Sequence, residues 1–164
     1  MEARMNVAQV DPEVISTLLG LSKYVMKSGL EQSLLDLVLV RASQVNRCAG
    51  CLDMHYKDAR ASGETEQRLY SLDAWRETPY YSDRERAALA WTEAVTVLTE
   101  GYVADEVYEQ VRQQFTETEL IDLSMAIIGI NGWNRLNVSF RTVPGGYQSQ
   151  RTPDPARKAV PAIG

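Results

Sequence analysis

The sequence predicts an all-α protein with a single domain. Apolar residues recur at helical spacing, and residues suited to helix N-caps precede several of these stretches. No run alternates apolar and polar residues between turn signals, as strands do. The chain has 164 residues, of which 45% are hydrophobic. A chain of this length buries about two thirds of the surface that it exposes when unfolded, so a hydrophobic core is enough to stabilise it.

Three helices are expected in the first third of the chain. Asp11 followed by Pro12 begins the first, because the Asp side chain accepts bonds from free N–H groups and proline needs no partner at the first helical position. One face of this helix is apolar and comprises Val14, Leu18, Leu21, Tyr24 and Val25. The second helix covers about residues 31–45. The third opens near Cys48 and ends at Gly63, a residue type suited to the left-handed conformation that follows a helix.

The middle of the chain predicts three further helices. A short one is expected over residues 65–75 and is followed by a break. Ser82 and Glu85 form a capping box that begins the next helix, which runs to about Thr99. Its apolar face comprises Ala87, Trp91, Ala94, Val95 and Leu98. Apolar residues at helical spacing, Val107, Val111 and Phe115, then mark a further helix.

A second capping box, Thr116 with Glu119, begins a long helix that reaches about Asn137. Its apolar residues lie on more than one side, so we expect a central helix; they are Leu120, Ile121, Leu123, Ile127, Ile128 and Ile130. Gly129 and Gly132 within it each cost about 1 kcal/mol against alanine. They indicate either the close approach of another helix, from this subunit or a neighbour, or a local kink.

Residues 1–147 are expected to form the helical domain and residues 148–164 a flexible C-terminal tail. From Pro144 onward the chain holds four of its six prolines, two adjacent glycines and scattered charges. This composition is typical of mobile chain ends, so we expect the fold to end before the tail.

Charge and hydropathy exclude several classes of function. The chain has 17 basic and 22 acidic side chains and a net charge of -5, which argues against nucleic acid as a partner because that affinity depends on Lys and Arg. The start of the chain shows no secretory signal. The longest apolar stretches are interrupted by Asp36 and Asp122 and fall short of the roughly 20 residues that span a bilayer. Two cysteines make no disulfide scaffold, so a cytoplasmic protein without membrane contact is expected.

Cys48, Cys51 and His55 form a CxxC followed by xxxH, and they include every cysteine and the only histidine of the chain. If Cys48 lies in the first turn of its helix, spacings of three and four residues place all three side chains on one face. Two sulfurs one turn apart can close a disulfide when their Cα atoms are less than about 7 Å apart. The spacing therefore predicts two thiols that can cycle between dithiol and disulfide.

The position of the motif predicts reactivity. A helix N-terminus favours the thiolate, the nucleophilic form of cysteine, because its N–H groups carry partial positive charge. His55 is expected to act as the general base toward Cys51, four residues away. Asp36 is the expected acid that orients His55, since it shares with Gln32 and Ser43 a narrow polar stripe in an otherwise apolar helix.

Other interpretations of these residues stay open. The cysteines could be buried small hydrophobes, and Asp36 could lie on a solvated face or pair with a basic side chain. Together with the three residues of the motif, Asp36 would suit zinc by ligand type, although three ligands on one helix make a tetrahedral shell awkward. Haem attachment is excluded because Leu52 stands where the histidine would be needed, and an iron-sulfur cluster needs more thiolates than the chain has.

An acid twelve residues before a CxxC, with a histidine four residues after it, is a specific combination. The stretch from Asp36 to Thr65 adds Ser43, Gln44, Val45, Asn46, Cys48, Cys51, Asp53, Met54, His55, Asp58, Ala59, Arg60 and Gly63. It resembles the core of the AhpD-like alkylhydroperoxidases of the carboxymuconolactone decarboxylase family. The resemblance continues through residues 75–79, 87–93 and 131–135 and covers roughly residues 10–147. Thioredoxin, by contrast, places its CxxC after a strand, and no strand is readable here.

The resemblance implies an all-α fold that assembles into homo-oligomers, usually trimers or hexamers, with peroxidase or disulfide reductase activity in antioxidant defence. Cys51 resembles the peroxidatic cysteine that becomes a sulfenic acid, Cys48 the partner that condenses with it to a disulfide, and His55 the relay histidine. No metal, haem or other cofactor is implied, because the sulfur carries the electrons. The implied reductant is an external dithiol or redox protein of the lipoyl or thioredoxin type, with a peroxiredoxin as a further partner.

Two positions depart from the family. Its acid is usually Glu, so Asp36 is one methylene shorter, and characterised members can carry a second histidine where this chain has Gly50. The expected function is a thiol-dependent alkyl hydroperoxide reductase or disulfide reductase. The alternatives are a decarboxylase of a small carboxylic acid, in which Arg135 would bind the carboxylate and the cysteines would be dispensable, and a non-enzymatic redox sensor.

Overall fold

The computed structural model describes residues 2–99 and 101–155, and the regular structure within these ranges is all helical. The helices are α1 (Val7–Val10), α2 (Pro12–Val25), α3 (Gln32–Val45), α4 (Ala49–Ala61), α5 (Glu66–Ser71), the 3₁₀ helix η1 (Leu72–Glu77), α6 (Asp83–Thr96), α7 (Asp105–Arg112) and α8 (Glu117–Phe140). The all-α fold that the sequence predicts is confirmed for this part of the chain. Within the same ranges, no helix has the length and apolar character needed to cross a bilayer.

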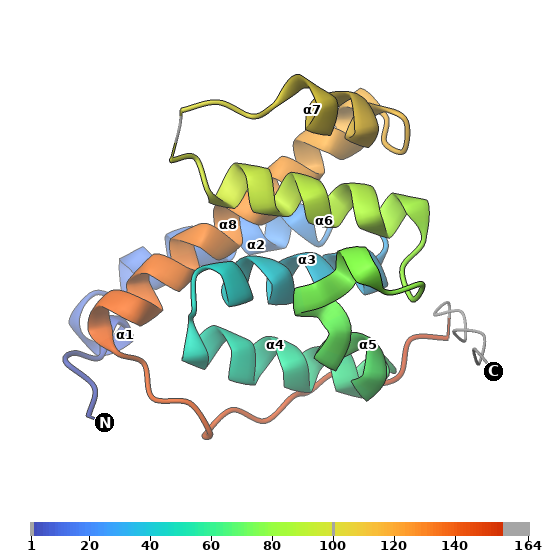
Figure 1. Cartoon of the computed structure of the whole chain (residues 1–164). Helices are drawn as coiled ribbons and strands as arrows, with labels where there is room; N and C mark the ends of the chain where they lie inside the picture. Colours follow the sequence, from blue (N-terminus) through green and yellow to red (C-terminus); the bar gives the residue numbers. More distant parts are fainter. Residues whose placement is uncertain (1, 100, 156–164) are drawn as a thin grey trace.

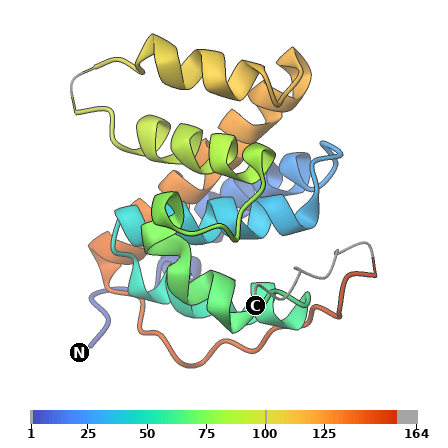
Figure 2. The ribbon, with the colours of Figure 1, turned by 45° about the vertical axis from the view of Figure 1, so that its right-hand side comes forward.

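The helices are arranged in layers around α3 (Figure 1, Figure 2). One side of α3 packs against α4, whereas α6 and α8 pack against its other side. α7 lies beyond α6, and α2 packs along α8. Because α3 is covered on both sides, its sequence neighbours Leu37 and Val38 are each 0% exposed and belong to two separate core clusters.

The predicted starts of the helices agree with the structure. The carboxylate of Asp11 accepts bonds from two backbone N–H groups in the first turn of α2. Ser82 with Glu85 closes one capping box before α6, and Thr116 with Glu119 closes the other before α8. Each box satisfies N–H groups that have no partner within the helix, which fixes the residue at which the helix begins.

Three local details differ from the expectation. The single helix expected over residues 65–75 is divided into α5 and η1, and Ala74 within η1 has non-helical angles (φ -110°, ψ 30°). α6 ends at Thr96 because Val97 leaves the helical conformation, so Leu98, expected on the buried face, is 53% exposed. The short helix α1, which no sequence pattern predicted, precedes α2 and is capped by Asn6.

The two glycines of α8 allow a close approach of α2. A Cβ atom at Gly129 would lie 3.4 Å from Cδ2 of Leu21, and one at Gly132 would lie 3.2 Å from Cδ2 of Leu18. Of the two interpretations of these glycines, the approach of a neighbouring helix is the one that the structure shows, and that helix belongs to the same chain.

α8 is central on one side only. Leu123 and Ile127 are 0% exposed in the core, whereas Ile121 and Ile128 are 60% and 52% exposed. The all-round apolar pattern therefore reflects a helix with a buried face and an exposed apolar face, and the expected central position applies to one face only.

After α8, residues 141–155 form a segment that we name the C-terminal arm, and it runs along α4 (Figure 1, Figure 2). Arg141 ends α8 in the left-handed conformation (φ 56°) and turns the chain into the arm. Near the start of the arm, Gly145 donates its N–H to Oδ2 of Asp53, and near its end Asp154 donates its N–H to the carbonyl oxygen of Ser62. The first part of the expected tail over residues 148–164 thus makes specific bonds, and residues 156–164 lie outside the described residues.

Candidate redox site

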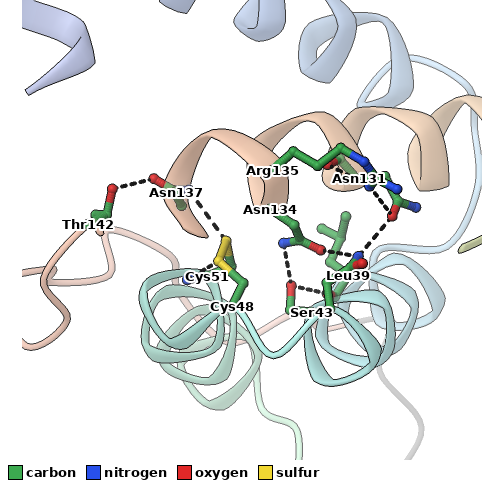
Figure 3. The surroundings of a disulfide bond; sticks show 10 residues. Leu39, Ser43, Cys48, Cys51, Asn131, Asn134, Arg135, Asn137 and Thr142 are labelled. Atoms are coloured by element: carbon green, nitrogen blue, oxygen red, sulfur yellow. Dashed lines mark hydrogen bonds between the residues drawn. A yellow bond between two sulfur atoms is a disulfide. The ribbon is translucent and has the colours of Figure 1, made fainter. Parts of the chain in front are cut away.

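The two cysteines lie where the chain turns from α3 into α4 (Figure 3). Arg47 makes the turn in the left-handed conformation (φ 54°), and Cys48 is the N-cap residue of α4. The first turn of α4 brings Cys51 beside Cys48, so their Cα atoms are 5.3 Å apart and their sulfurs form a disulfide. The spacing of the motif therefore produces the pairing distance that a dithiol cycle requires.

Each sulfur accepts a hydrogen bond from an N–H group. The backbone N–H of Cys51 donates to Sγ of Cys48 at 3.3 Å, which is the N-cap bond of α4. The side-chain amide of Asn137 donates to Sγ of Cys51 at 3.4 Å, and the hydroxyl of Thr142 donates to Oδ1 of Asn137 at 2.6 Å (Figure 3). Both cysteines are 1% exposed. The sequence did not indicate Asn137 or Thr142 as site residues, because no local pattern links them to Cys51, which is 86 positions before Asn137.

His55 lies one turn beyond Cys51 on the same face of α4 and is 9% exposed. Its Nε2 atom has no hydrogen-bond partner among the described residues. Burial is the main cause that lowers the pKa of His55 from 6.5 to about 4, while the charge of Asp58 acts to raise it and the charge of Arg151 acts to lower it. The imidazole is therefore neutral at neutral pH and able to accept a proton.

Asp36 is buried under the arm. It is 2% exposed, accepts a bond from Nε2 of Gln32 at 2.9 Å and pairs with Nη1 of Arg151 at 2.5 Å. Among the described residues, no hydrogen bond joins Asp36 to His55. The carboxylate that the sequence places near the motif thus meets a guanidinium from the arm. The third member of its polar stripe, Ser43, bonds to Leu39 and to Asn134 of α8 instead (Figure 3).

Asp58 is a second buried acid beside His55. It lies three residues after the histidine and is 6% exposed. Its Oδ1 atom accepts bonds from the hydroxyls of Tyr147 at 2.8 Å and Ser149 at 2.6 Å, and its Oδ2 atom lies 3.6 Å from Nε of Arg151. Its position three residues after His55 is the signal that could have placed Asp58 on the same face of α4, but its partners come from the arm and could not be predicted from spacing.

The described residues therefore place a disulfide-bonded cysteine pair, an imidazole and two acids in one buried region, with Arg151 close to both acids. Within the described ranges, no three His, Cys, Asp or Glu side chains gather into a set that could hold a metal ion. What the arrangement can do chemically is to exchange two electrons at the sulfurs and to accept a proton at the histidine.

Comparison with known proteins places this chain in a family. Residues 12–94 match the carboxymuconolactone decarboxylase family. The uncharacterized protein YdfG of Bacillus subtilis (strain 168) is 40% identical over 139 residues, which make up 85% of this chain and 95% of YdfG. The uncharacterized protein YnjA of Escherichia coli (strain K12) is 33% identical over 105 residues, which make up 63% of this chain and 56% of YnjA.

Solved structures share the fold. A protein of unknown function from Agrobacterium tumefaciens, provisionally named as the antioxidant defence protein AhpD, superimposes with a TM-score of 0.86 at 39% identity and covers 89% of this chain and 100% of its own. The debrominase Bmp8 superimposes with a TM-score of 0.76 at 17% identity, over 84% of this chain and 74% of its own, a likeness of fold alone. The sequence match and the shared fold lead to one conclusion: the chain belongs to the carboxymuconolactone decarboxylase family, as an AhpD-like member.

Proposed function

We propose that this protein is a thiol-dependent oxidoreductase of the AhpD kind, which reduces an organic hydroperoxide or the disulfide of another molecule. The observation that carries the proposal is the pair of Cys48 and Cys51 at disulfide distance at the start of α4, with His55 one turn away. A pair at this distance takes up and returns two electrons with little movement of the backbone.

The reaction begins with both thiols reduced. The thiolate of Cys51 attacks the terminal oxygen of the hydroperoxide, the O–O bond breaks, and Cys51 becomes a sulfenic acid. The alkoxide takes the proton that His55 received from Cys51 and leaves as the alcohol. The thiol of Cys48 then loses its proton and attacks the sulfur of Cys51, the hydroxide of the sulfenic acid leaves as water with that proton, and the disulfide forms. An external dithiol returns both thiols by two exchange steps and is itself oxidised to a disulfide.

His55 acts as the general base for the attacking thiol. His55 is neutral at the pH of the cell, and the neutral imidazole is the form that can take the proton of Cys51, directly or through one water. In this proposal Asp36 acts through Arg151 rather than by holding the imidazole. Asp36 and Asp58 both pair with Arg151, and the positive charge of Arg151 favours the neutral form of His55.

The reductant and the assembly follow from the same proposal. The electron donor is a dithiol of the lipoyl or thioredoxin type, with a peroxiredoxin as a further partner, and the protein works in the reducing cytoplasm. It forms a homo-oligomer, a trimer or hexamer, and the exposed apolar residues Ile121 and Ile128 of α8 are consistent with a face that another subunit covers.

The relatives agree with this chemistry at the level of the family. The Agrobacterium tumefaciens protein is named for antioxidant defence but is of unknown function, and the debrominase shares the fold alone. The fold therefore does not identify the substrate of this protein. The decarboxylase alternative has less support, because Arg135 bonds to Asn131 on its own helix instead of marking a binding pocket with the thiols.

Trapping of the sulfenic acid tests the proposal. Reduced Cys48→Ser protein is mixed with one equivalent of cumene hydroperoxide and dimedone, and the labelled residue is identified by mass spectrometry. We expect a single adduct at Cys51. The Cys51→Ser protein, treated alike, is the matched control and should give little adduct at Cys48. Equal labelling of the two variants, or none in either, would overturn the assignment of Cys51.

A further inference from the structure

The sulfur of Cys51 receives a hydrogen bond from outside its own helix. Asn137, in the last turn of α8, directs its Nδ2 atom to Sγ of Cys51 at 3.4 Å (Figure 3). A disulfide sulfur carries no proton and can only accept, so this contact is a hydrogen bond only when the amide presents its N–H. The bond joins two helix ends that are 86 positions apart in the chain.

Thr142, at the start of the arm, holds the amide in this orientation. Its hydroxyl donates to Oδ1 of Asn137 at 2.6 Å, and its backbone N–H donates to the carbonyl oxygen of Asn137 at 2.9 Å. Gly50 leaves the space that Thr142 needs, because a Cβ atom at position 50 would lie 3.3 Å from both Cγ2 and O of Thr142. The residue between the two cysteines is thus in contact with the residue that orients the donor.

The two sulfurs have donors of different origin. Sγ of Cys48 accepts the backbone N–H of Cys51, which any residue at position 51 would supply. Sγ of Cys51 accepts a side-chain N–H, which depends on the residue at position 137. A substitution of Asn137 therefore removes the donor of one sulfur and leaves the N-cap bond of the other in place.

We propose that Asn137 is a further catalytic residue of the redox site, which donates its amide N–H to the attacking thiolate of Cys51, and that Thr142 is the positioning residue that orients it. This inference rests on the proposed role of Cys51 as the attacking thiol. A hydrogen bond to a charged acceptor is roughly twice as strong as one to a neutral acceptor. Asn137 therefore stabilises the thiolate of Cys51 more than its thiol or its disulfide, and so raises the fraction of the reactive form.

The test measures the ionisation of Cys51 without any peroxide. In the reduced Cys48→Ser background, the rate of alkylation of Cys51 by iodoacetamide is followed across pH, and its midpoint reports the fraction of thiolate. Asn137→Leu should move the midpoint upward by about one pH unit, a tenfold loss of rate at pH values below the midpoint. Thr142→Val should move it in the same direction, and Thr142→Ser, which keeps the hydroxyl, should restore it.

A matched control separates this role from a structural one. Asn131→Leu removes another half-buried amide from α8, whose N–H groups bond to Thr96 and Ile127 and whose oxygen accepts from Asn46 and Arg135. This amide bonds to neither sulfur, so its loss should leave the midpoint unchanged. Thr142 is exposed, so its variants should fold even if Asn137→Leu does not. Unchanged midpoints in folded Asn137→Leu and in Thr142→Val would overturn the inference. Since no peroxide is present, this result is independent of whether Cys51 reduces hydroperoxides.

Discussion

Arg151 and Asp36 form a salt bridge of 2.5 Å, although 115 positions separate them in the chain. Asp36 is 2% exposed, so the guanidinium reaches into a buried position between the arm, α3 and α4. The same guanidinium lies 3.6 Å from Asp58 and affects His55 through its charge. The arm is therefore part of the environment of the redox site.

Loss of this guanidinium should destabilise the protein. In Arg151→Met the buried carboxylate of Asp36 loses a charged hydrogen bond, which typically contributes about 2 kcal/mol. We expect the free energy of unfolding in urea to fall by about this amount. Arg135→Met, which changes an exposed arginine whose partner among the described residues is Asn131 of the same helix, is the control, and its free energy of unfolding should fall by much less. If the free energy of unfolding fell equally in the two variants, the salt bridge between Arg151 and Asp36 would contribute no stability beyond that of an exposed arginine.

Protonation of His55 should weaken the fold in acid. The pKa of His55 is lowered from 6.5 to about 4 by burial, so below pH 6.5 the unfolded chain binds a proton that the native protein does not bind. The free energy of unfolding should therefore decrease as the pH falls from about 6.5 to about 4, by about 3 kcal/mol in total for this group. Above pH 6.5 the group should have no effect.

The matched variant for this prediction is His55→Gln, which keeps a polar side chain that does not titrate. Unfolding in urea is measured for both proteins at half-unit steps between pH 4 and pH 7.5, and the difference between the two curves isolates the histidine from the carboxylates. A difference that stays constant across this window would show that the pKa of His55 is not lowered in the native protein.

The N-cap role of Cys48 predicts that its two simplest replacements differ. Ser has a side-chain oxygen that can accept the N–H of Cys51, whereas Ala has no acceptor, and loss of an N-cap typically costs about 1 kcal/mol. We therefore expect Cys48→Ala to be less stable than Cys48→Ser by about 1 kcal/mol in urea. Both variants lack the disulfide, so its contribution cancels in the comparison. If Cys48→Ala were more stable than Cys48→Ser, the N-cap role of Cys48 would be contradicted.

The packing of α2 on α8 predicts opposite effects at two glycines. Leu in place of Gly132 should collide with Leu18, whose Cδ2 already lies 3.2 Å from an added Cβ, and should lower stability by about 1–3 kcal/mol. A Cβ atom added at Gly20 would meet nothing within 4 Å, so Gly20→Leu should raise the stability by roughly 0.5–1 kcal/mol through helix propensity. Thermal unfolding of both variants checks the pair. A neutral Gly132→Leu would mean that α2 can move away freely.

The parts of the fold that the sequence predicts well are local. The capping box of Ser82 and Glu85 lies within four residues, so its pattern is visible in the sequence, and both of its hydrogen bonds are present in the structure. The spacing of Cys48, Cys51 and His55 gives a common face as soon as the helix is assumed, and the structure brings the sulfurs together on it. Both results depend only on residues within about two helical turns of one another.

The parts that could not be predicted depend on distant segments. The polar stripe predicts that Asp36 orients His55, but helical spacing cannot say which group its carboxylate meets, and its partner Arg151 comes from a segment with no periodicity. Asn137 is likewise an ordinary polar residue at the end of a helix until α8 is packed against α4. Burial and long-range packing, which single-sequence patterns do not contain, determine both contacts.

Thiol-dependent peroxide reduction is tested most directly by the steady-state consumption of cumene hydroperoxide with a dithiol reductant. The proteins compared are the unmodified protein, Cys51→Ser and Cys48→Ser. Free thiols are counted before and after oxidation of the reduced unmodified protein. We predict that turnover requires both cysteines and that each chain loses two thiols on oxidation. Turnover of the unmodified protein that persists at full rate in Cys51→Ser, or an unmodified protein that loses no thiols in peroxide, would contradict the account.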